Sequence, residues 1–157
     1  MEAQADWPQL ATPETYLGYA RGERLATMGE PALDEPRGYE LPEHLRVNQW
    51  GLAGEWIIGR ENVALLRTGG SITVRFHARD AHLVLSPGGR DPIPFRVLVD
   101  GEAAGSLARS RRRRGWKRSA PRRPPLPARA PARPRPRGTL TITFLDAGVE
   151  AYAFTFG

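Results

Sequence analysis

The chain has 157 residues and a formal net charge of +6 at pH 7, and this length suits one domain with a single core. It contains no cysteine, which excludes disulfides, thiolate metal sites and dithiol redox chemistry within the chain. No apolar run approaches the roughly 18 residues that a membrane-spanning helix needs, and the polar residues 1–4 lack the features of a signal peptide.

Residues 1–46 show little periodicity. Polar sequence surrounds a lone Trp7-Pro8 pair, so residues 1–11 are predicted to be a linker. Prolines at positions 31, 36 and 42 disfavour a long helix in residues 12–46. This part is therefore predicted to form loops with one or two short strands.

Apolar residues alternate with polar ones from residue 47 onward, which is the pattern of half-buried strands. The predicted strands cover residues 50–58, 71–78, 83–85, 95–99, 140–144 and 152–156. Turn residues such as Asp100-Gly101 separate them. The last strand carries Tyr152, Phe154 and Phe156 and is predicted to be central and buried. We therefore predict an all-β fold, a jelly-roll-like β-sandwich of six or seven strands built from residues 12–106 and 138–157.

Residues 107–137, which we call the basic segment, differ sharply from the rest. The segment holds 13 of the 23 Lys and Arg residues, seven of the 15 prolines and no acid. Without it, 10 basic and 17 acidic residues remain, a net charge of −7. Because prolines remove ladder donors and like charges repel, we expect a disordered insertion that cannot form a strand in the sheet.

Three interpretations of the basic segment stay open. Codons for Arg, Pro, Ala and Gly are rich in G and C, so a stretch translated in a shifted reading frame would have this composition. A second interpretation is a solvated loop without function. A third is a polyanion-binding segment that acts by counterion release and base stacking, through Arg111, Arg112, Arg113, Arg114, Trp116, Lys117 and Arg118.

Trp50 and Trp56 are the candidate ligand-binding residues of the β-domain. Six residues apart, they share one face of a regular strand, where they could form a platform for a sugar or fill the core. Tyr16 and Tyr19 bracket Gly18 and are interpreted as packing and loop residues. Two histidines near an aspartate, His77, Asp80 and His82, match no zinc motif and are interpreted as surface residues. No catalytic motif is present, so we expect no catalytic residue, no metal site and no cofactor.

Four strings together resemble a known family: residues 12–19 (TPETYLGY), 52–56 (LAGEW), 75–80 (RFHARD) and 149–157 (VEAYAFTFG). They are similar to the C-terminal domain of DipZ-type cytochrome c biogenesis and thioredoxin-family (redoxin) proteins of actinobacteria. In that family a thioredoxin domain with a WCxxC site precedes a β-sandwich like a carbohydrate-binding module. The likeness covers residues 12–106 and 138–157 and leaves out the basic segment.

The resemblance implies a non-catalytic accessory domain, here as a fragment without its thioredoxin domain. Its partner would be that thioredoxin domain, in cis or encoded upstream, or a carbohydrate. Family members with a membrane domain hold this module on the outer face of the membrane, whereas this chain is expected not to insert into a membrane. The alternative is a small basic nucleic-acid-binding protein that acts through the basic segment.

Overall fold

The computed structural model describes residues 12–89, 91–103, 108–109 and 137–157. No described segment is helical, and none is therefore a helix long and apolar enough to cross a membrane. The strands are β1 (Thr15–Tyr16), β2 (Pro36–Tyr39), β3 (Trp50–Ile58), β4 (Val63–Leu65), β5 (Ser71–His77), β6 (Ala81–Ser86), β7 (Pro94–Val99), β8 (Glu102–Ala103), β9 (Ala108–Arg109), β10 (Arg137–Phe144) and β11 (Glu150–Phe156).

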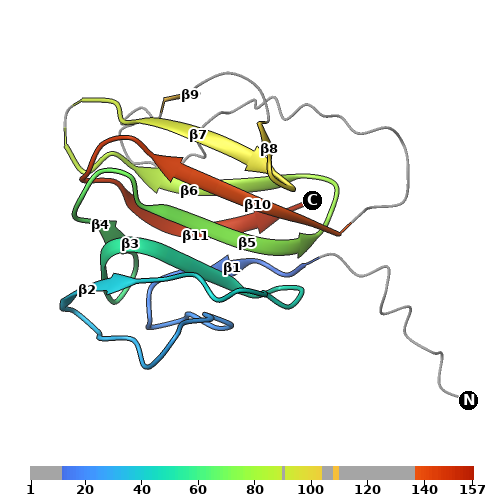
Figure 1. Cartoon of the computed structure of the whole chain (residues 1–157), viewed down its shortest axis with the longest axis horizontal. Coiled ribbons are helices and arrows are strands. Elements are labelled where there is room, and N and C mark those ends of the chain that lie inside the picture. Colours follow the sequence, from blue (N-terminus) through green and yellow to red (C-terminus); the bar gives the residue numbers. More distant parts are fainter. Residues whose placement is uncertain (1–11, 90, 104–107, 110–136) are drawn as a thin grey trace, which may run out of the picture.

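The strands form two antiparallel layers, and in Figure 1 β7, β10 and β5 lie in front of β6 and β11. We call the front layer sheet B. It consists of the first half of β3, then β5, β10 and β7, with β8 and β9 on the outer edge of β7. Sheet A contains β6, β11, β1, β4 and β2 with the second half of β3. The predicted all-β sandwich is confirmed.

Strand β3 belongs to both sheets. Residues 50–53 pair with β5 of sheet B, whereas residues 54–57 pair with β2 and residues 56–58 with β4 of sheet A. The change of sheet occurs at Gly54, which has a φ of 107°. A Cβ at Gly54 would lie 2.8 Å from the Cα of Gly70, so both the left-handed backbone and the close approach require glycine here.

The space between the two sheets holds the core. Trp56 packs edge-on against Phe144 of β10, with ring centroids 6.2 Å apart, and so joins sheet A to sheet B. The alternation along each strand sends every second side chain into this space. The largest fully buried side chains are those of Trp50, Trp56, Phe95, Phe144, Phe154, Leu17, Leu52, Ile58, Leu65, Ile72, Val63 and Val74.

The strands predicted from residue 50 onward correspond to β3, β5, β6, β7, β10 and β11. One or two short strands were expected in residues 12–46, and the structure has two, β1 and β2. Strand β4 was not predicted, because three residues are too few to show an alternation. The predicted linker, residues 1–11, and most of the basic segment lie outside the described residues.

Both ends of the basic segment belong to sheet B, so the prediction that none of it could form a strand is wrong there. Residues 108–109 pair with β7, and Arg137 begins β10 opposite His77. The prolines of the segment run from Pro121 to Pro136. Its two ends therefore keep the backbone N–H groups that a ladder needs.

Strand β11 is central, as predicted, with β6 on one edge and β1 and β4 on the other. Its alternation, however, is interrupted by a register shift between Ala151 and Ala153. Ala151 and Phe154 are both fully buried although they are three residues apart. The bulge thus turns the half-buried Tyr152 away from the core, which the alternation alone did not reveal.

Candidate functional site

The two tryptophans proposed as a sugar platform are core residues. Trp50 is 1% exposed and Trp56 is 0% exposed. Their indole nitrogens donate to backbone oxygens, Trp50 to Glu23 O at 3.0 Å and Trp56 to Ala53 O at 2.9 Å. Since a sugar needs an open aromatic face for stacking, the platform interpretation is wrong and the core interpretation is correct.

The other candidate residues give no site within the described part of the chain. The seven proposed polyanion-binding residues, positions 111–114 and 116–118, lie outside it. His77 and His82 are on β5 and β6, and Asp80 pairs with its neighbour Arg79 at 3.2 Å. Among the described residues no three His, Asp or Glu side chains come together as metal ligands would.

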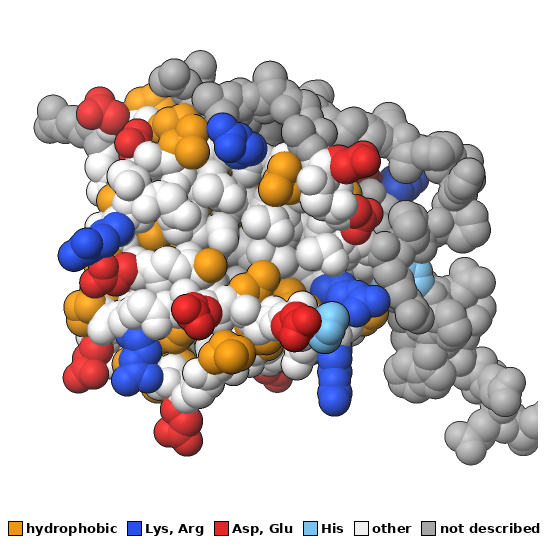
Figure 2. Space-filling view, in the orientation of Figure 1, with side chains coloured by type: hydrophobic (Ala, Val, Ile, Leu, Met, Phe, Trp, Pro, Cys, Tyr) orange, Lys and Arg blue, Asp and Glu red, His pale blue; other side chains and the backbone are white. Residues whose placement is uncertain are grey.

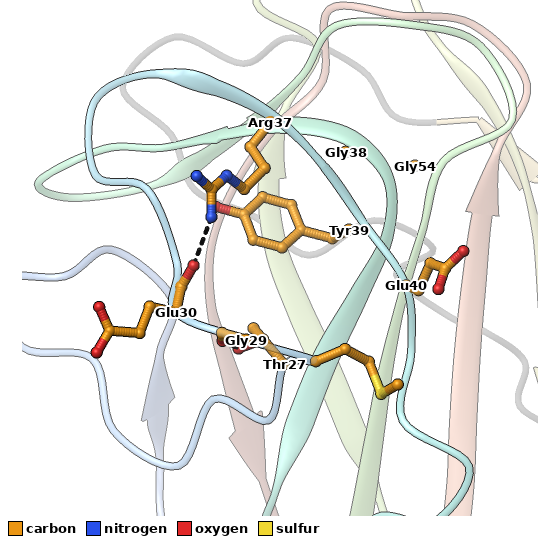
Figure 3. Close-up of a pocket in the computed structure, with 9 residues that line it drawn as sticks. Thr27, Gly29, Glu30, Arg37, Gly38, Tyr39, Glu40 and Gly54 are labelled. Carbon is orange, nitrogen blue, oxygen red and sulfur yellow. Dashed lines mark hydrogen bonds between the residues drawn. The ribbon is translucent and has the colours of Figure 1, made fainter.

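A pocket of about 580 Å³ opens beside β2 and is shown in Figure 3. Its floor is made by β2 and Gly54 of β3, and the loop of residues 27–30 forms its opposite wall. Met28, a large apolar side chain that is 68% exposed, also lines it. The pocket therefore combines an exposed thioether with a polar wall.

Backbone contacts hold the polar wall of this pocket in place. The Arg37 guanidinium donates to the Glu30 carbonyl at 2.6 Å, and the Tyr39 hydroxyl accepts from Ala32 N at 3.1 Å. In Figure 3 the carboxylates of Glu30 and Glu40 point away from each other, so they do not form one acidic pair. This geometry offers a recess for a side chain and no paired acid and base for catalysis.

The outer face of sheet A carries an aromatic surface. Tyr16 of β1 lies opposite Ala153 of β11, which lies opposite Val84 of β6. The next outward row, two residues along β6 and beyond the bulge in β11, places Ile57 opposite Ala64, and Ala64 lies opposite Glu150. These side chains point away from the core because the neighbouring row, which includes Phe154, points into it. We call this surface, formed by Tyr16, Tyr152, Val84, Ile57 and Ala64, the tyrosine face.

Polar contacts fix both tyrosines. The Arg21 guanidinium lies 3.9 Å from the centre of the Tyr16 ring, a cation–π contact. A hydrogen bond with Glu14 raises the pKa of Tyr16. The Tyr152 hydroxyl donates to Glu150 Oε2 at 3.0 Å. Burial raises the pKa of Tyr152, the Asn62 amide lowers it, and Glu150 raises it further.

The outer face of sheet B is different. Its outward positions on β5 and β10 include five hydroxyl side chains, which we call the hydroxyl face: Ser71, Thr73, Thr139, Thr141 and Thr143. Two of them, Thr73 and Thr141, are hydrogen bonded across the strands at 3.0 Å. Figure 2 shows this side of the molecule as a largely uncharged surface over β5, β10 and β7 with charged side chains around it.

The string of residues 12–19 anchors the start of the domain. The Thr12 backbone N–H donates to His77 O at 2.9 Å, and the Thr12 hydroxyl accepts from His77 N at 2.7 Å. Leu17 N donates to Tyr152 O at 2.9 Å. A Cβ at Gly18 would lie 2.3 Å from the Glu61 carbonyl carbon, so a larger residue does not fit. This string therefore connects the first strand to the last.

Comparison with known families agrees with this arrangement. The family described as thioredoxin-like C-terminal domain matches residues 12–157. The chain belongs to this family. Its matched region begins at Thr12, the residue that binds His77 at the entrance to β1. No curated protein matches the chain.

Sequence reasoning missed the tyrosine face. Tyr16 and Tyr152 both belong to sequence strings that carry the family resemblance. This was the one signal in the sequence that could have pointed to them. Tyr152 was assigned to a buried strand because its spacing from Phe154 is two residues. Only the bulge in β11 separates the two side chains.

Proposed function

We propose that this domain is a non-catalytic accessory module of a thioredoxin-family protein and that it docks on the thioredoxin-like domain. The observation that carries the proposal is the family match over residues 12–157. A chain without cysteine cannot itself exchange dithiols. Its contribution to a thioredoxin-family protein would therefore be to bind, position or shield.

The DipZ-type resemblance sharpens this proposal. It suggests that the partner domain performs thiol–disulfide exchange on the outer face of a membrane, in the service of cytochrome c biogenesis. A carbohydrate ligand would have to bind at a surface other than Trp50 and Trp56, because both are buried. Domain docking is the function that an accessory module with a half-buried aromatic face supports best.

Binding to a thioredoxin-like domain tests the proposal. The probe is such a domain, with its WCxxC pair, from a family member that contains both domains. Calorimetry should give a dissociation constant in the micromolar range or below, which is typical of specific docking. In an insulin-reduction assay, the 157-residue chain alone should have no activity. Two results would contradict the proposal. One is the absence of binding at about 100 micromolar, roughly 100 times a micromolar dissociation constant. The other is reductase activity of the isolated chain.

The composition of the basic segment favours a second candidate, binding to nucleic acid. Thirteen cationic residues without an acid would bind phosphates with a steep salt dependence. DNA binding measured between 50 and 200 mM salt should then fall by orders of magnitude, on the scale of about 10³-fold for six or more phosphate contacts. Deletion of residues 110–136 should abolish it. Salt-independent binding, or binding that survives the deletion, would contradict this candidate.

A further inference from the structure

We propose that the tyrosine face is the surface on which the thioredoxin-like domain docks. This inference rests on the proposed function and adds the location of the interface. The face consists of outward side chains of β1, β3, β4, β6 and β11. It excludes the pocket beside β2 and the whole of sheet B.

The composition of the tyrosine face is that of an interface. Tyrosine and arginine are enriched among the residues that contribute most to binding, because they combine apolar area with a polar end. Here Tyr16 lies on β1 and Tyr152 on the paired strand β11, with Arg21 stacked on Tyr16. Val84, Ile57 and Ala64 on the neighbouring strands supply apolar area beside them.

The two tyrosines are already ordered in the free domain. Tyr152 is held by its hydrogen bond to Glu150, and Asn62 donates to the same carboxylate oxygen at 3.4 Å. Arg21 holds the ring of Tyr16. A partner that binds here loses little side-chain entropy on ordering them.

The position at which the chain enters the β-domain favours the domain that precedes it as the partner. A thioredoxin-like domain that precedes this C-terminal domain is joined to it through Thr12, where the family match begins. Thr12 is fixed to His77 by two hydrogen bonds. Tyr16 follows four residues later, and an extended chain spans about 14 Å over that length. The preceding domain is thus tethered within about 14 Å of Tyr16, which gives it a high effective concentration at the tyrosine face.

The hydroxyl face is a less suitable docking surface. Its central pair, Thr73 and Thr141, is hydrogen bonded internally, and its outward positions on β5 and β10 hold no Phe, Tyr or Trp. Burying such a surface would remove hydroxyls from water for little apolar gain. It therefore serves as the control surface for the experiment.

The test compares two matched variants of the 157-residue chain. Val84→Arg places a guanidinium in the tyrosine face, and Thr143→Arg places the same group on the hydroxyl face. Both wild-type side chains are β-branched and half-buried, and both point outward from a strand. Binding to the thioredoxin-like domain is measured by calorimetry, and thermal unfolding followed by circular dichroism verifies that each variant is folded. Tyr16→Ala provides a second variant of the tyrosine face.

The inference expects Val84→Arg and Tyr16→Ala each to weaken binding at least about tenfold, and Thr143→Arg to change it less than twofold. If both tyrosine-face variants bind as tightly as the wild type, the tyrosine face is not the docking surface, while the proposed function stands. Equal weakening by Thr143→Arg would also overturn it. No wild-type binding would overturn both proposals. A wild-type dimer that Val84→Arg dissociates would assign the face to a second copy of the chain and overturn the partner named here.

Discussion

The two outer faces of the sandwich share one geometry and differ in chemistry. On sheet A the outward positions include two tyrosines bound to charged neighbours, whereas on sheet B they include five hydroxyl side chains, two of which are bonded to each other. Both faces cover the same core and follow the same two-residue alternation. The comparison teaches that the alternation decides which side chains are outside, and the outward side chains alone decide what a face can bind.

The largest effect is expected from a substitution in the core, which supports both faces. Trp56→Ala empties the space between the sheets and deletes the contact with Phe144. The free energy of unfolding should fall by about 3–5 kcal/mol, measured by urea denaturation. Trp56→Phe should lose less, because it keeps an aromatic ring in the space. A loss below about 1 kcal/mol in Trp56→Ala would show that the indole does not join the two sheets.

The next effect concerns the residue where β3 passes from one sheet to the other. Gly54→Ala forces a side chain into a left-handed conformation and against Gly70. We expect a loss of about 1–3 kcal/mol in the free energy of unfolding. Gly38→Ala is the matched control, since the space beside that glycine in the paired strand β2 is open and its φ is not positive. Equal effects of the two substitutions would contradict a special role for Gly54.

A smaller effect isolates the hydroxyl face. Thr73→Val and Thr141→Val each break the hydrogen bond between these side chains, and a double-mutant cycle should give a coupling of about 0.5–1.5 kcal/mol. Thr73 is buried although it points away from the core, so its single substitution should cost more than that of Thr141. Binding to the thioredoxin-like domain should be unchanged in all three variants. Zero coupling would mean that water satisfies each hydroxyl independently.

The smallest expected effect concerns Tyr152 of the tyrosine face. It is a change in the unfolding free energy that appears only at alkaline pH. Burial, the largest cause, raises the folded-state pKa of Tyr152 above its ordinary value of 10.0, so the folded state holds this proton more tightly than the unfolded state. That contribution to stability is complete below pH 10 and is lost as the pH rises through the folded pKa. Tyr152→Phe should therefore flatten the decline of the unfolding free energy above pH 10. Parallel pH profiles of wild type and variant would show that Tyr152 titrates as it does in the unfolded chain.

Much of the fold could be predicted because the alternation of apolar and polar residues within a strand is visible in that strand's own sequence. Ile72, Val74 and Phe76 identify β5 without reference to any partner, and the flanking glycines and prolines end the strands. Pairing could not be predicted in the same way. That β10 lies between β5 and β7, across the basic segment, depends on contacts between distant residues.

The candidate site was harder to predict than the fold. Trp50 and Trp56 suggested a platform because aromatic residues can stack on sugars, yet the same spacing puts them in the core. Burial depends on what lies across a strand, and here the second sheet covers both indoles. Tyr16 and Tyr152, in contrast, attracted no prediction as ligands, although both remain partly exposed.

The sequence by itself determined the all-β class, the positions of the long strands, the absence of thiol chemistry and the charge imbalance of the basic segment, because each is a property of composition or local period. Only the tertiary structure decided that Gly54 carries β3 from one sheet to the other, that a bulge turns Tyr152 outward, and that the two tryptophans are buried. These features arise where strands distant in sequence meet, and the packing of the partner strand selects among conformations that the local sequence permits equally.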